Sequence, residues 1–365
     1  MRYFSIKDTV LSLEEVENTR FDIVSNVKNY SVQIQDEDIE KMIHREYSNG
    51  NIVVLDKNVF EIYSKSMRVI NPDDTFIIDA QEENKTIETA LNLISFLSQK
   101  NFHKKNNMVV IGGGITQDIG SFVGACFKRG IDWTFIPTTL LAQCDSCIGS
   151  KSGLNYNEIK NQIGLFSPPK RIAVNPNFLK TLAPEEIKSG LGEILKVYLM
   201  AGNNLFDFYS QRVKKGEIES FSSWGELILK SLLIKKQIIE NDELERDIRR
   251  ALNYGHTVGH AIETLTNYQI PHGQAVALGV YVSNTINKTI SDEVGEEILT
   301  LVTNKDILKK IDYDKMKLVL MRDKKSIGED IMMVFVDPSS GSSRLDYVNV
   351  NILVEKIKNV IDHIL

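Results

Sequence analysis

Short apolar segments alternate with amphipathic segments along the first half of the chain, and this pattern predicts an α/β domain. Five segments read as buried strands: 30–35, 51–58, 108–111, 133–137 and 171–174. Between them, apolar residues at helical spacing predict helices within 36–48 and 85–100. Strands that alternate with helices form a parallel sheet, whose ligands bind beyond the carboxyl ends of the strands. Functional side chains are therefore expected directly after the strands.

From residue 184 onward, the apolar positions follow helical spacing almost to the end, which predicts a second domain made of helices. An apolar run at 331–336 predicts a short strand or hairpin there. The predicted fold is an N-terminal α/β domain, residues 1–174, followed by an all-α C-terminal domain, residues 175–365. Residues 1–30 hold no recognisable motif and read as an N-terminal extension that adds an edge strand or hairpin.

One stretch of the second domain, residues 248–268, predicts a helix with an apolar face and a polar stripe beside it. The stripe consists of Arg249, Asn253, His256 and His260. Their intervals of four, three and four residues place them on one side of a helix. A lone histidine is usually a core residue, but four functional side chains in one row favour a metal or ligand site.

The chain also offers ligands for a catalytic metal ion. His272 follows the stripe in a Pro-His-Gly turn, and Glu193 lies in the helix that begins near Pro184. Glu193, His256 and His272 would leave one coordination position open, as catalytic zinc requires. The alternative for Glu193 is an ordinary surface ion pair with Lys196, three residues further along the helix.

A run of three glycines, Gly112–Gly114, joins the strand at 108–111 to a predicted helix. Such a turn lets backbone N–H groups and a helix N-terminus face a diphosphate, although a tight turn explains the glycines alone equally well. Asp118 and, after the next strand, Thr138 and Thr139 add a carboxylate and hydroxyls. Together these residues favour a dinucleotide site.

The polar segment 145–164 contains Asp145, Lys151, Asn155, Lys160 and Asn161. It is too polar for a core strand and too apolar at intervals for a disordered segment. A solvated loop is the ordinary interpretation. The density of lysine and asparagine beside a nucleotide site instead favours an anionic substrate.

Composition narrows the functional classes. A hydrophobic content of 42% and a charged content of 25% are ordinary for a globular protein, and 365 residues suffice for two domains. No segment approaches the roughly 20 apolar residues that span a bilayer, and the N-terminus lacks a signal-peptide pattern, so a cytoplasmic protein is expected. The net charge of −6 argues against nonspecific nucleic-acid binding. Cys144 and Cys147 form a lone C-x-x-C, which reads as structural rather than as a redox or zinc site.

Nine motifs in the chain resemble those of the 3-dehydroquinate synthases, within the sugar-phosphate cyclase family. They are GGGITQD at 112–118, KRG at 128–130, PTTLLAQCDS at 137–146, GSKSGLN at 149–155, KNQIG at 160–164, FLKTL at 178–182, SGLGEILK at 189–196, LNYGHTVGHAIE at 252–263 and HG at 272–273. The resemblance implies a Rossmann-like domain that binds NAD, a helical domain that binds zinc or cobalt, and a homodimer. Gln117, Ser150 and Gln274 depart from the family pattern by replacing two glycines and a glutamate, which leaves the exact substrate open.

The resemblance also implies roles for individual residues. The metal ligands fall on Glu193, His256 and His272. The NAD contacts fall on Asp56, Asn58, Glu82, Lys85, Gly113, Gly114, Asp118, Thr138, Thr139, Lys151, Lys160, Phe178 and Thr181. The residues near the nicotinamide and the substrate are Asp145, Lys151, Lys160 and Asn161, and those that contact the substrate and its phosphate are Lys196, Asn253 and His260. Lys235 and Arg249 match the pair that holds a substrate carboxylate, Arg129 matches a residue that reaches the partner subunit's phosphate site, and Lys324 or Lys325 matches a C-terminal active-site lysine.

The implied reaction converts 3-deoxy-arabino-heptulosonate 7-phosphate to 3-dehydroquinate and phosphate by transient oxidation, β-elimination, reduction and aldol closure. Lys235 and Arg249 favour this carboxylate-bearing substrate over neutral heptulose phosphates. One alternative is a cyclase of a specialised pathway, acting on sedoheptulose 7-phosphate or an amino analogue. A metal-dependent NAD polyol dehydrogenase is a second alternative. A noncatalytic ligand-binding relative is a third, which the intact candidate ligands argue against.

Overall fold

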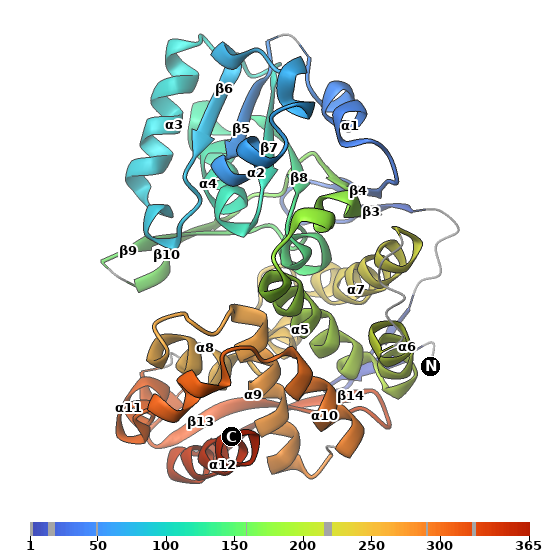
Figure 1. Cartoon of the computed structure of the whole chain (residues 1–365), viewed down its shortest axis with the longest axis vertical. Coiled ribbons are helices and arrows are strands. Elements are labelled where there is room, and N and C mark those ends of the chain that lie inside the picture. The colour runs from blue at the N-terminus through green and yellow to red at the C-terminus, as the bar shows by residue number, and fades with distance from the viewer. Residues whose placement is uncertain are drawn as a thin grey trace. The chain divides into compact units, whose positions relative to one another are not determined.

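The computed structural model describes residues 3–13, 19–48, 50–157, 159–214, 221–289, 291–322 and 326–365 (Figure 1). The chain forms two compact units. The α/β unit comprises Glu15–Leu182 and Trp224–Leu232, and the helical unit comprises Met1–Glu14, Ala183–Ser223 and Leu233–Leu365. This division differs from the expected boundary after residue 174, and it places the first strands of the chain with the C-terminal elements.

The α/β unit contains a seven-stranded sheet in the order β3-β4-β11-β8-β7-β5-β6. Its strands are β3 (Arg20–Ile23), β4 (Tyr30–Ile34), β5 (Ile52–Asp56), β6 (Thr75–Ile78), β7 (Asn107–Gly112), β8 (Asp132–Pro137) and β11 (Arg171–Val174). Within this sheet, β3 pairs antiparallel with β4 and the other pairs are parallel. The five predicted strands and the parallel sheet are confirmed, while β3 and β6 extend the two edges.

Apolar residues on both faces explain why the central strands are buried. Val109 and Ile111 of β7 belong to a core cluster that also includes Met42. Val110, which points to the other face, is fully buried as well. Strands that are covered on both sides are expected to read as continuous apolar runs rather than as alternating patterns.

Helices connect these strands, and polar side chains cap several of them. The helices are α1 (Ile39–Glu46), α2 (Lys57–Ile62), α3 (Ile87–Gln99) and α4 (Gly114–Cys126). Asp38 caps α1 by accepting hydrogen bonds from the backbone N–H groups of Glu40 and Lys41. The helices predicted within 36–48 and 85–100 are therefore confirmed as α1 and α3.

The polar segment 145–164 forms a hairpin outside the main sheet, so its interpretation as a solvated loop was wrong. Strands β9 (Lys151–Tyr156) and β10 (Ile159–Phe166) pair antiparallel, with a register shift between Ile159 and Ile163. A short π-helix, Ala142–Ser146, precedes the hairpin. Short 3₁₀ segments complete the connections in the two units, at Ser66–Val69, Pro72–Asp74, Glu82–Asn84, Phe127–Arg129, Pro176–Thr181 and Lys305–Lys310.

The helical unit contains α5 (Pro184–Ala201), α6 (Asn203–Lys214), α8 (His256–Leu265), α9 (His272–Asn287), α10 (Asp292–Leu301), α11 (Tyr313–Met321) and α12 (Val350–Ile364). Residues of α7 (Phe221–Asn241) belong partly to each unit. No helix in the described part of the chain is long and apolar enough to cross a membrane.

The helical unit also contains a sheet, so the expectation of an all-α domain was incomplete. Five strands lie in the order β12-β13-β14-β1-β2: β12 (Ser326–Ile327), β13 (Asp330–Asp337), β14 (Ser342–Asn349), β1 (Tyr3–Ile6) and β2 (Thr9–Ser12). The strand or hairpin predicted at 331–336 and the hairpin predicted within residues 1–30 are confirmed. Strand β1 pairs with β14, more than 300 residues away, and a local sequence pattern does not reveal such a pairing.

The stretch 248–268 is interrupted, so the prediction of one continuous helix was wrong. Ile248–Asn253 is a 3₁₀ segment, and α8 begins only at His256. Between them, Gly255 has a φ of +77°, a left-handed conformation that ends the first segment. Arg249 and Asn253 therefore lie on a different element from His256 and His260.

Candidate active site

Three helices of the helical unit bring together the predicted metal ligands. Glu193 lies in α5, His256 at the first residue of α8 and His272 at the first residue of α9. A Cβ atom on Gly192 would lie 2.1 Å from the carbonyl oxygen of Gly273. The two glycines therefore let the backbones of α5 and α9 touch, which places the following Glu193 beside His272.

The carboxylate of Glu193 faces the two imidazoles. Its Oε1 lies 3.4 Å from Nε2 of His272 and 3.8 Å from Nε2 of His256. This oxygen is buried and has no hydrogen-bond partner in the described residues, whereas Oε2 accepts a hydrogen bond from Lys196. A buried carboxylate oxygen without a donor is costly unless a cation completes it, so the donor set fits a divalent metal.

His260 also belongs to this cluster. The candidate ligand atoms of His256, His260 and His272 all lie within 4.8 Å of one another. The ring of His260 is 5.3 Å from that of His256, in an edge-to-face arrangement. Because His260 lies one turn after His256 on α8 and is exposed, it sits at the open side of the cluster.

Each of the two imidazoles that face Glu193 is partly buried and is oriented through its second nitrogen. Nδ1 of His272 lies 3.0 Å from Oε2 of Glu263, and Nδ1 of His256 lies 3.2 Å from the carbonyl oxygen of Tyr254. With its proton on Nδ1, the neutral form of each imidazole directs its Nε2 lone pair toward Glu193. Glu263 was not among the predicted site residues, although it lies seven residues after His256 and continues the spacing of the polar stripe.

Burial and charge shift the pKa values in this cluster in different directions. Burial, together with the cation of Lys196, holds the pKa of His256 well below its usual value, so this imidazole is neutral and able to bind a metal. Burial opposes ionisation of Glu193, but Lys196 and the two histidines outweigh it and lower the pKa of the carboxyl. Burial lowers the pKa of His272, but the negative charges of Glu193 and Glu263 outweigh it and raise the pKa to about 10, so a metal ion that binds Nε2 must displace a proton.

Three cationic side chains predicted to hold the substrate are buried in this half of the chain. Lys196 and Arg249 are 2% and 3% exposed, and Lys235 on α7 is 7% exposed. The guanidinium of Arg249 donates a hydrogen bond to the carbonyl oxygen of Glu243. Because charges attract each other more strongly away from water, these positions are suited to anionic groups of a ligand.

The 3₁₀ segment that carries Arg249 is anchored by Asp242. Its carboxylate accepts hydrogen bonds from the backbone N–H groups of Arg246, Asp247 and Arg249 at 2.7–3.0 Å. These bonds lower the pKa of Asp242 despite its partial burial. Asn253, at the end of the segment, donates a hydrogen bond to Glu245 at 2.8 Å.

In the α/β unit, the predicted nucleotide residues lie at the carboxyl ends of adjacent strands. Asp56 ends β5, the glycine run ends β7, and Thr138 follows β8. Helix α4 begins after Gly113, an N-cap residue with no side chain to bond its N–H groups, and a Cβ on Gly114 would meet nothing closer than 3.9 Å among the described residues. An uncapped helix N-terminus with open space in front of it fits a diphosphate.

The remaining predicted NAD residues line the same end of the sheet. Phe178 and Thr181 lie on the 3₁₀ segment Pro176–Thr181, which follows β11. Tyr63 contacts both, through a ring contact at 5.2 Å and a hydrogen bond of 2.7 Å to the hydroxyl of Thr181. Asn58 lies in the first turn of α2, where its backbone N–H donates to the side chain of Asp56.

A network of polar residues ties the hairpin to this strand end. The ammonium of buried Lys85 donates to Asp118 at 3.0 Å and to Asn161 at 2.7 Å. Lys160 lies 3.8 Å from Glu82. Burial raises the pKa of Asp118 to about 6, with Lys85 acting in the opposite direction. Five predicted site residues are thus brought together by one set of contacts.

The other predicted residues have diverse surroundings. Arg129 is exposed in a turn with a φ of +64°, Lys151 is exposed at the start of β9, and Asp145 lies in the π-helix. Lys324 and Lys325 lie outside the described residues. Cys144 and Cys147 are buried and form no disulfide with each other.

Two of the three departures from the family pattern have structural explanations, and the third, Ser150, has none. Gln117 and Ser146 exchange two hydrogen bonds, at 2.7 and 2.9 Å, which fasten the π-helix to α4. Gln274 is fully buried and joins α5 to the loop before Lys305. Ser150 adopts a φ of +64°, a conformation that favours the glycine found in the family.

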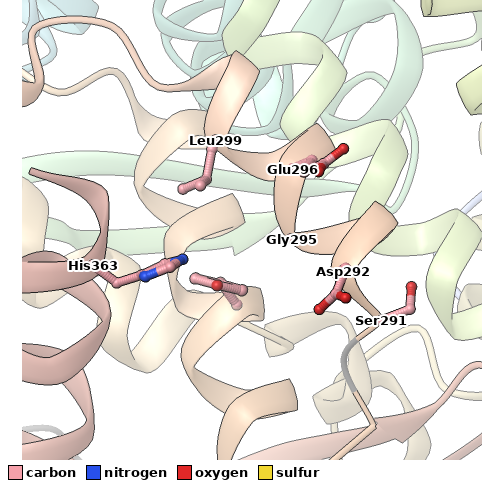
Figure 2. A pocket seen from close by; sticks show the side chains of 7 residues that line it. Ser291, Asp292, Gly295, Glu296, Leu299 and His363 are labelled. Atoms are coloured by element: carbon pink, nitrogen blue, oxygen red, sulfur yellow. The ribbon is translucent and has the colours of Figure 1, made fainter.

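A separate pocket in the helical unit contains none of the predicted site residues. Figure 2 shows it between α10 and the end of α12; the labelled residues are Ser291, Asp292, Gly295, Glu296, Leu299 and His363.

Comparison with solved structures defines the class of fold. The chain superposes on 2-epi-5-epi-valiolone synthase from Streptomyces hygroscopicus, solved with NAD⁺ and Zn²⁺, with a TM-score of 0.77, 20% identity and coverage of 98% and 99% of the two chains. A 2-deoxy-scyllo-inosose synthase solved with carbaglucose-6-phosphate, NAD⁺ and Co²⁺ gives a TM-score of 0.77 at 22% identity, covering 93% of this chain and all of the other. A probable glycerol dehydrogenase from Sinorhizobium meliloti gives 0.62 at 14% identity, covering 91% and 96%. The fold is therefore that of the sugar-phosphate cyclases, which polyol dehydrogenases share more distantly.

Sequence comparison then gives the family. Models of the N-terminal and C-terminal parts of 3-dehydroquinate synthase match residues 75–189 and 190–326. The 3-dehydroquinate synthase of Lactococcus lactis is 33% identical over 320 residues, 86% of each chain, and that of Sulfurisphaera tokodaii is 34% identical over 309 residues, 80% of this chain and 88% of the other. The chain belongs to the 3-dehydroquinate synthase family.

Proposed function

We propose that this enzyme converts 3-deoxy-arabino-heptulosonate 7-phosphate to 3-dehydroquinate and phosphate, with NAD in the α/β unit and zinc or cobalt in the helical unit. The observation that carries the proposal is the buried Oε1 of Glu193. This oxygen has no hydrogen-bond partner in the described residues. It faces the Nε2 atoms of two imidazole rings, and each ring is oriented by a contact at its Nδ1. Membership of the 3-dehydroquinate synthase family supports the substrate.

The reaction has one chemical difficulty. Elimination of phosphate requires removal of a proton from the carbon next to the one that bears the phosphate, and in the substrate that C–H is not acidic. Oxidation of the adjacent hydroxyl to a ketone acidifies that C–H, so that phosphate leaves by β-elimination. Reduction of the ketone, ring opening and aldol closure then give the carbocycle. When bound, NAD accepts and returns the hydride, and the divalent cation stabilises negative charge on the reacting oxygen.

The chain's own residues hold this substrate through its several steps. We assign Glu193, His256 and His272 to the metal, and Lys151, Lys196, Asn253 and His260 to the substrate and its phosphate. Lys196 is buried beside Glu193, so its ammonium offers a positive charge next to the metal cluster. We assign the role of base to the leaving phosphate, which accepts the proton from the carbon next to the ketone. Positioning of a flexible substrate is therefore the main contribution of the protein.

The carboxylate of the substrate decides between this reaction and its closest alternative. We assign Lys235 and Arg249 to that carboxylate, because both are buried cations and a guanidinium binds a carboxylate with two parallel hydrogen bonds. Heptulose phosphates that lack a carboxylate, such as sedoheptulose 7-phosphate, have no such group for Lys235 and Arg249 to bind. The alternative substrates are thus disfavoured, because they lack the group with which a guanidinium forms two parallel hydrogen bonds.

The NAD site is assigned to residues at the strand ends of the α/β unit: Asp56, Asn58, Glu82, Lys85, Gly113, Gly114, Asp118, Thr138, Thr139, Lys151, Lys160, Phe178 and Thr181. Asp145 and Asn161 are assigned to the region near the nicotinamide and the substrate. We further propose a cytoplasmic homodimer in which Arg129 reaches the phosphate site of the partner subunit. Lys325 is proposed as the C-terminal active-site lysine.

The test is to measure phosphate release with NAD and zinc or cobalt, using 3-deoxy-arabino-heptulosonate 7-phosphate and sedoheptulose 7-phosphate in separate reactions. We expect turnover of the first only. Turnover of the second alone would refute the assignment and support a cyclase of a specialised pathway. Net accumulation of NADH with a simple polyol would instead support a dehydrogenase, the function of a structure with a related fold.

A further inference from the structure

Asn155, near the end of β9, hydrogen-bonds with three residues from two parts of the α/β unit, and the sequence assigned it no individual role. Its side-chain amide donates to the carboxylate of Glu82 at 2.8 Å and to the carbonyl oxygen of Glu82 at 3.1 Å. Its side-chain oxygen accepts a hydrogen bond from the backbone N–H of Asn161 at 3.0 Å. Its own backbone N–H donates to the carbonyl oxygen of Lys85 at 2.8 Å.

The hydrogen bonds of Asn155 hold the irregular part of the β9–β10 hairpin in place. The β9–β10 register shifts between Ile159 and Ile163, and Asn161 within this bulge has a φ of +55°. A bulge redirects side chains, and a left-handed asparagine needs local bonds to hold it. The bond from Asn161 N–H to Asn155 supplies such a bond. Opposite the bulge, Gly153 leaves room for the Asn161 side chain, because a Cβ there would lie 2.6 Å from its oxygen.

The same bonds control the position of Lys85. Its backbone carbonyl is held by the N–H of Asn155, and its ammonium reaches Asn161 and Asp118. Lys85 is 6% exposed, so its charge depends on these few partners rather than on water. Asn155 therefore holds the backbone of Lys85 in place. It also holds Asn161, which accepts a hydrogen bond from the Lys85 ammonium.

We propose that Asn155 is a positioning residue for the NAD site: it locks the β9–β10 hairpin to the Glu82–Asn84 turn and so holds Glu82, Lys85 and Asn161 in one arrangement. This inference rests on the assignment of NAD to the α/β unit. Asn155 itself touches neither cofactor nor substrate in this scheme. It acts through the residues that do, because its side chain bonds both to Glu82 and to the backbone of Asn161.

The main test is Asn155→Asp in the full-length, metal-loaded enzyme. The substituted side chain keeps its shape and still accepts from Asn161, but a second negative charge replaces the donor to Glu82. We expect NAD⁺ to bind roughly 10- to 100-fold more weakly by calorimetric titration, because a donor is lost and two carboxylates face each other. Asn155→Ser removes the side-chain hydrogen bonds to Glu82 and Asn161 without adding charge, and it should also weaken NAD⁺ binding. It replaces the first variant in the test if Asn155→Asp fails to fold.

Two comparisons separate positioning from a general loss of structure. Asn157→Asp adds the same charge two residues away, at an exposed position in the turn, and should leave NAD⁺ binding unchanged. In the Glu82→Gln background, the new amide at position 82 can donate to the new carboxylate at position 155, so Asn155→Asp should cost less there than in the wild-type background. The affinity for Zn²⁺ should be unchanged, since the candidate metal ligands belong to the other unit.

The proposal is overturned if Asn155→Asp and Asn155→Ser bind NAD⁺ as the wild type does, or if Asn157→Asp weakens binding equally. It is also overturned if the loss of affinity is matched by loss of folded protein in thermal unfolding. Wild-type enzyme that binds NAD⁺ but does not release phosphate from 3-deoxy-arabino-heptulosonate 7-phosphate would refute the proposed reaction and leave the role of Asn155 standing. Wild-type enzyme that does not bind NAD⁺ would refute both.

Discussion

Removal of the Glu263 carboxylate is expected to weaken metal binding without touching any candidate ligand. Glu263 is 6% exposed, and its Oε2 lies 3.0 Å from Nδ1 of His272. In Glu263→Ala, the N–H of His272 loses its acceptor in a buried position, and the ring is free to rotate away from Glu193. In Glu263→Gln, a neutral oxygen still accepts the bond, so the orientation is retained but the charge is lost.

The magnitude follows from the type of contact. Partners that orient a metal-binding histidine typically contribute about 10- to 100-fold in metal affinity. At about 1.4 kcal/mol for each factor of ten, this range corresponds to about 1.4–2.8 kcal/mol, which is the size expected for a charge-assisted hydrogen bond. Glu263→Ala should lie near the upper end of the range, and Glu263→Gln near the lower end.

The assay is competition for Zn²⁺ between the metal-free enzyme and a chelating dye, which reports the dissociation constant directly. His256→Ala, which removes a proposed ligand, is the positive control and should abolish both metal binding and phosphate release. Glu355→Gln, an exposed position on α12, removes a charge without touching the cluster and should bind Zn²⁺ like the wild type. Equal affinities for the wild type and both Glu263 variants would refute the argument that this carboxylate orients His272.

Three further substitutions test other parts of the argument. Arg249→Ala should raise the KM for 3-deoxy-arabino-heptulosonate 7-phosphate by roughly 10- to 100-fold, because charged hydrogen bonds worth about 1.5–3 kcal/mol are lost; steady-state kinetics that match the wild type would remove the carboxylate assignment. Ser150→Gly should raise the free energy of unfolding by about 1 kcal/mol, since glycine accepts the φ of +64° without strain, and an unchanged urea midpoint would contradict this. Gln274→Glu should lower the free energy of unfolding by about 1–3 kcal/mol, because the Nε2 that donates to the carbonyl oxygen of Glu185 is replaced by an acceptor. Gln269→Glu, at an exposed position, is the control and should leave that free energy unchanged.

Local sequence patterns were sufficient for the elements whose structure depends on nearby residues. The central strands are continuous apolar runs because both faces are covered, and the helices between them carry recognisable caps such as Asp38. The helix that contains Glu193 starts at a proline with two acidic residues after it, as the sequence indicates. These features depend on a few neighbouring positions, so the sequence displays them directly.

Contacts between distant segments were less visible. The helical unit contains a sheet because β1 pairs with β14 from the other end of the chain, and neither strand alone indicates its partner. The break before α8 follows from the close approach of α9, since Gly255 lies where a Cβ would be 2.4 Å from the carbonyl oxygen of Val276. Glycine spacing in the sequence is compatible with either a continuous or an interrupted helix.

The sequence by itself determined the parallel α/β domain, the mainly helical second domain and the residue types for a metal, a dinucleotide and an anionic substrate. Only the tertiary structure decided that Glu193 leaves one buried oxygen facing His256 and His272, and that Glu263 contacts His272. In the other unit, it likewise decided that Asn155 donates a hydrogen bond to Glu82. The physical reason is that periodicity records which face of an element is buried. Hydrogen-bond partners depend on how separate elements approach one another, and in this protein close backbone contact at Gly192 and Gly273 sets that approach.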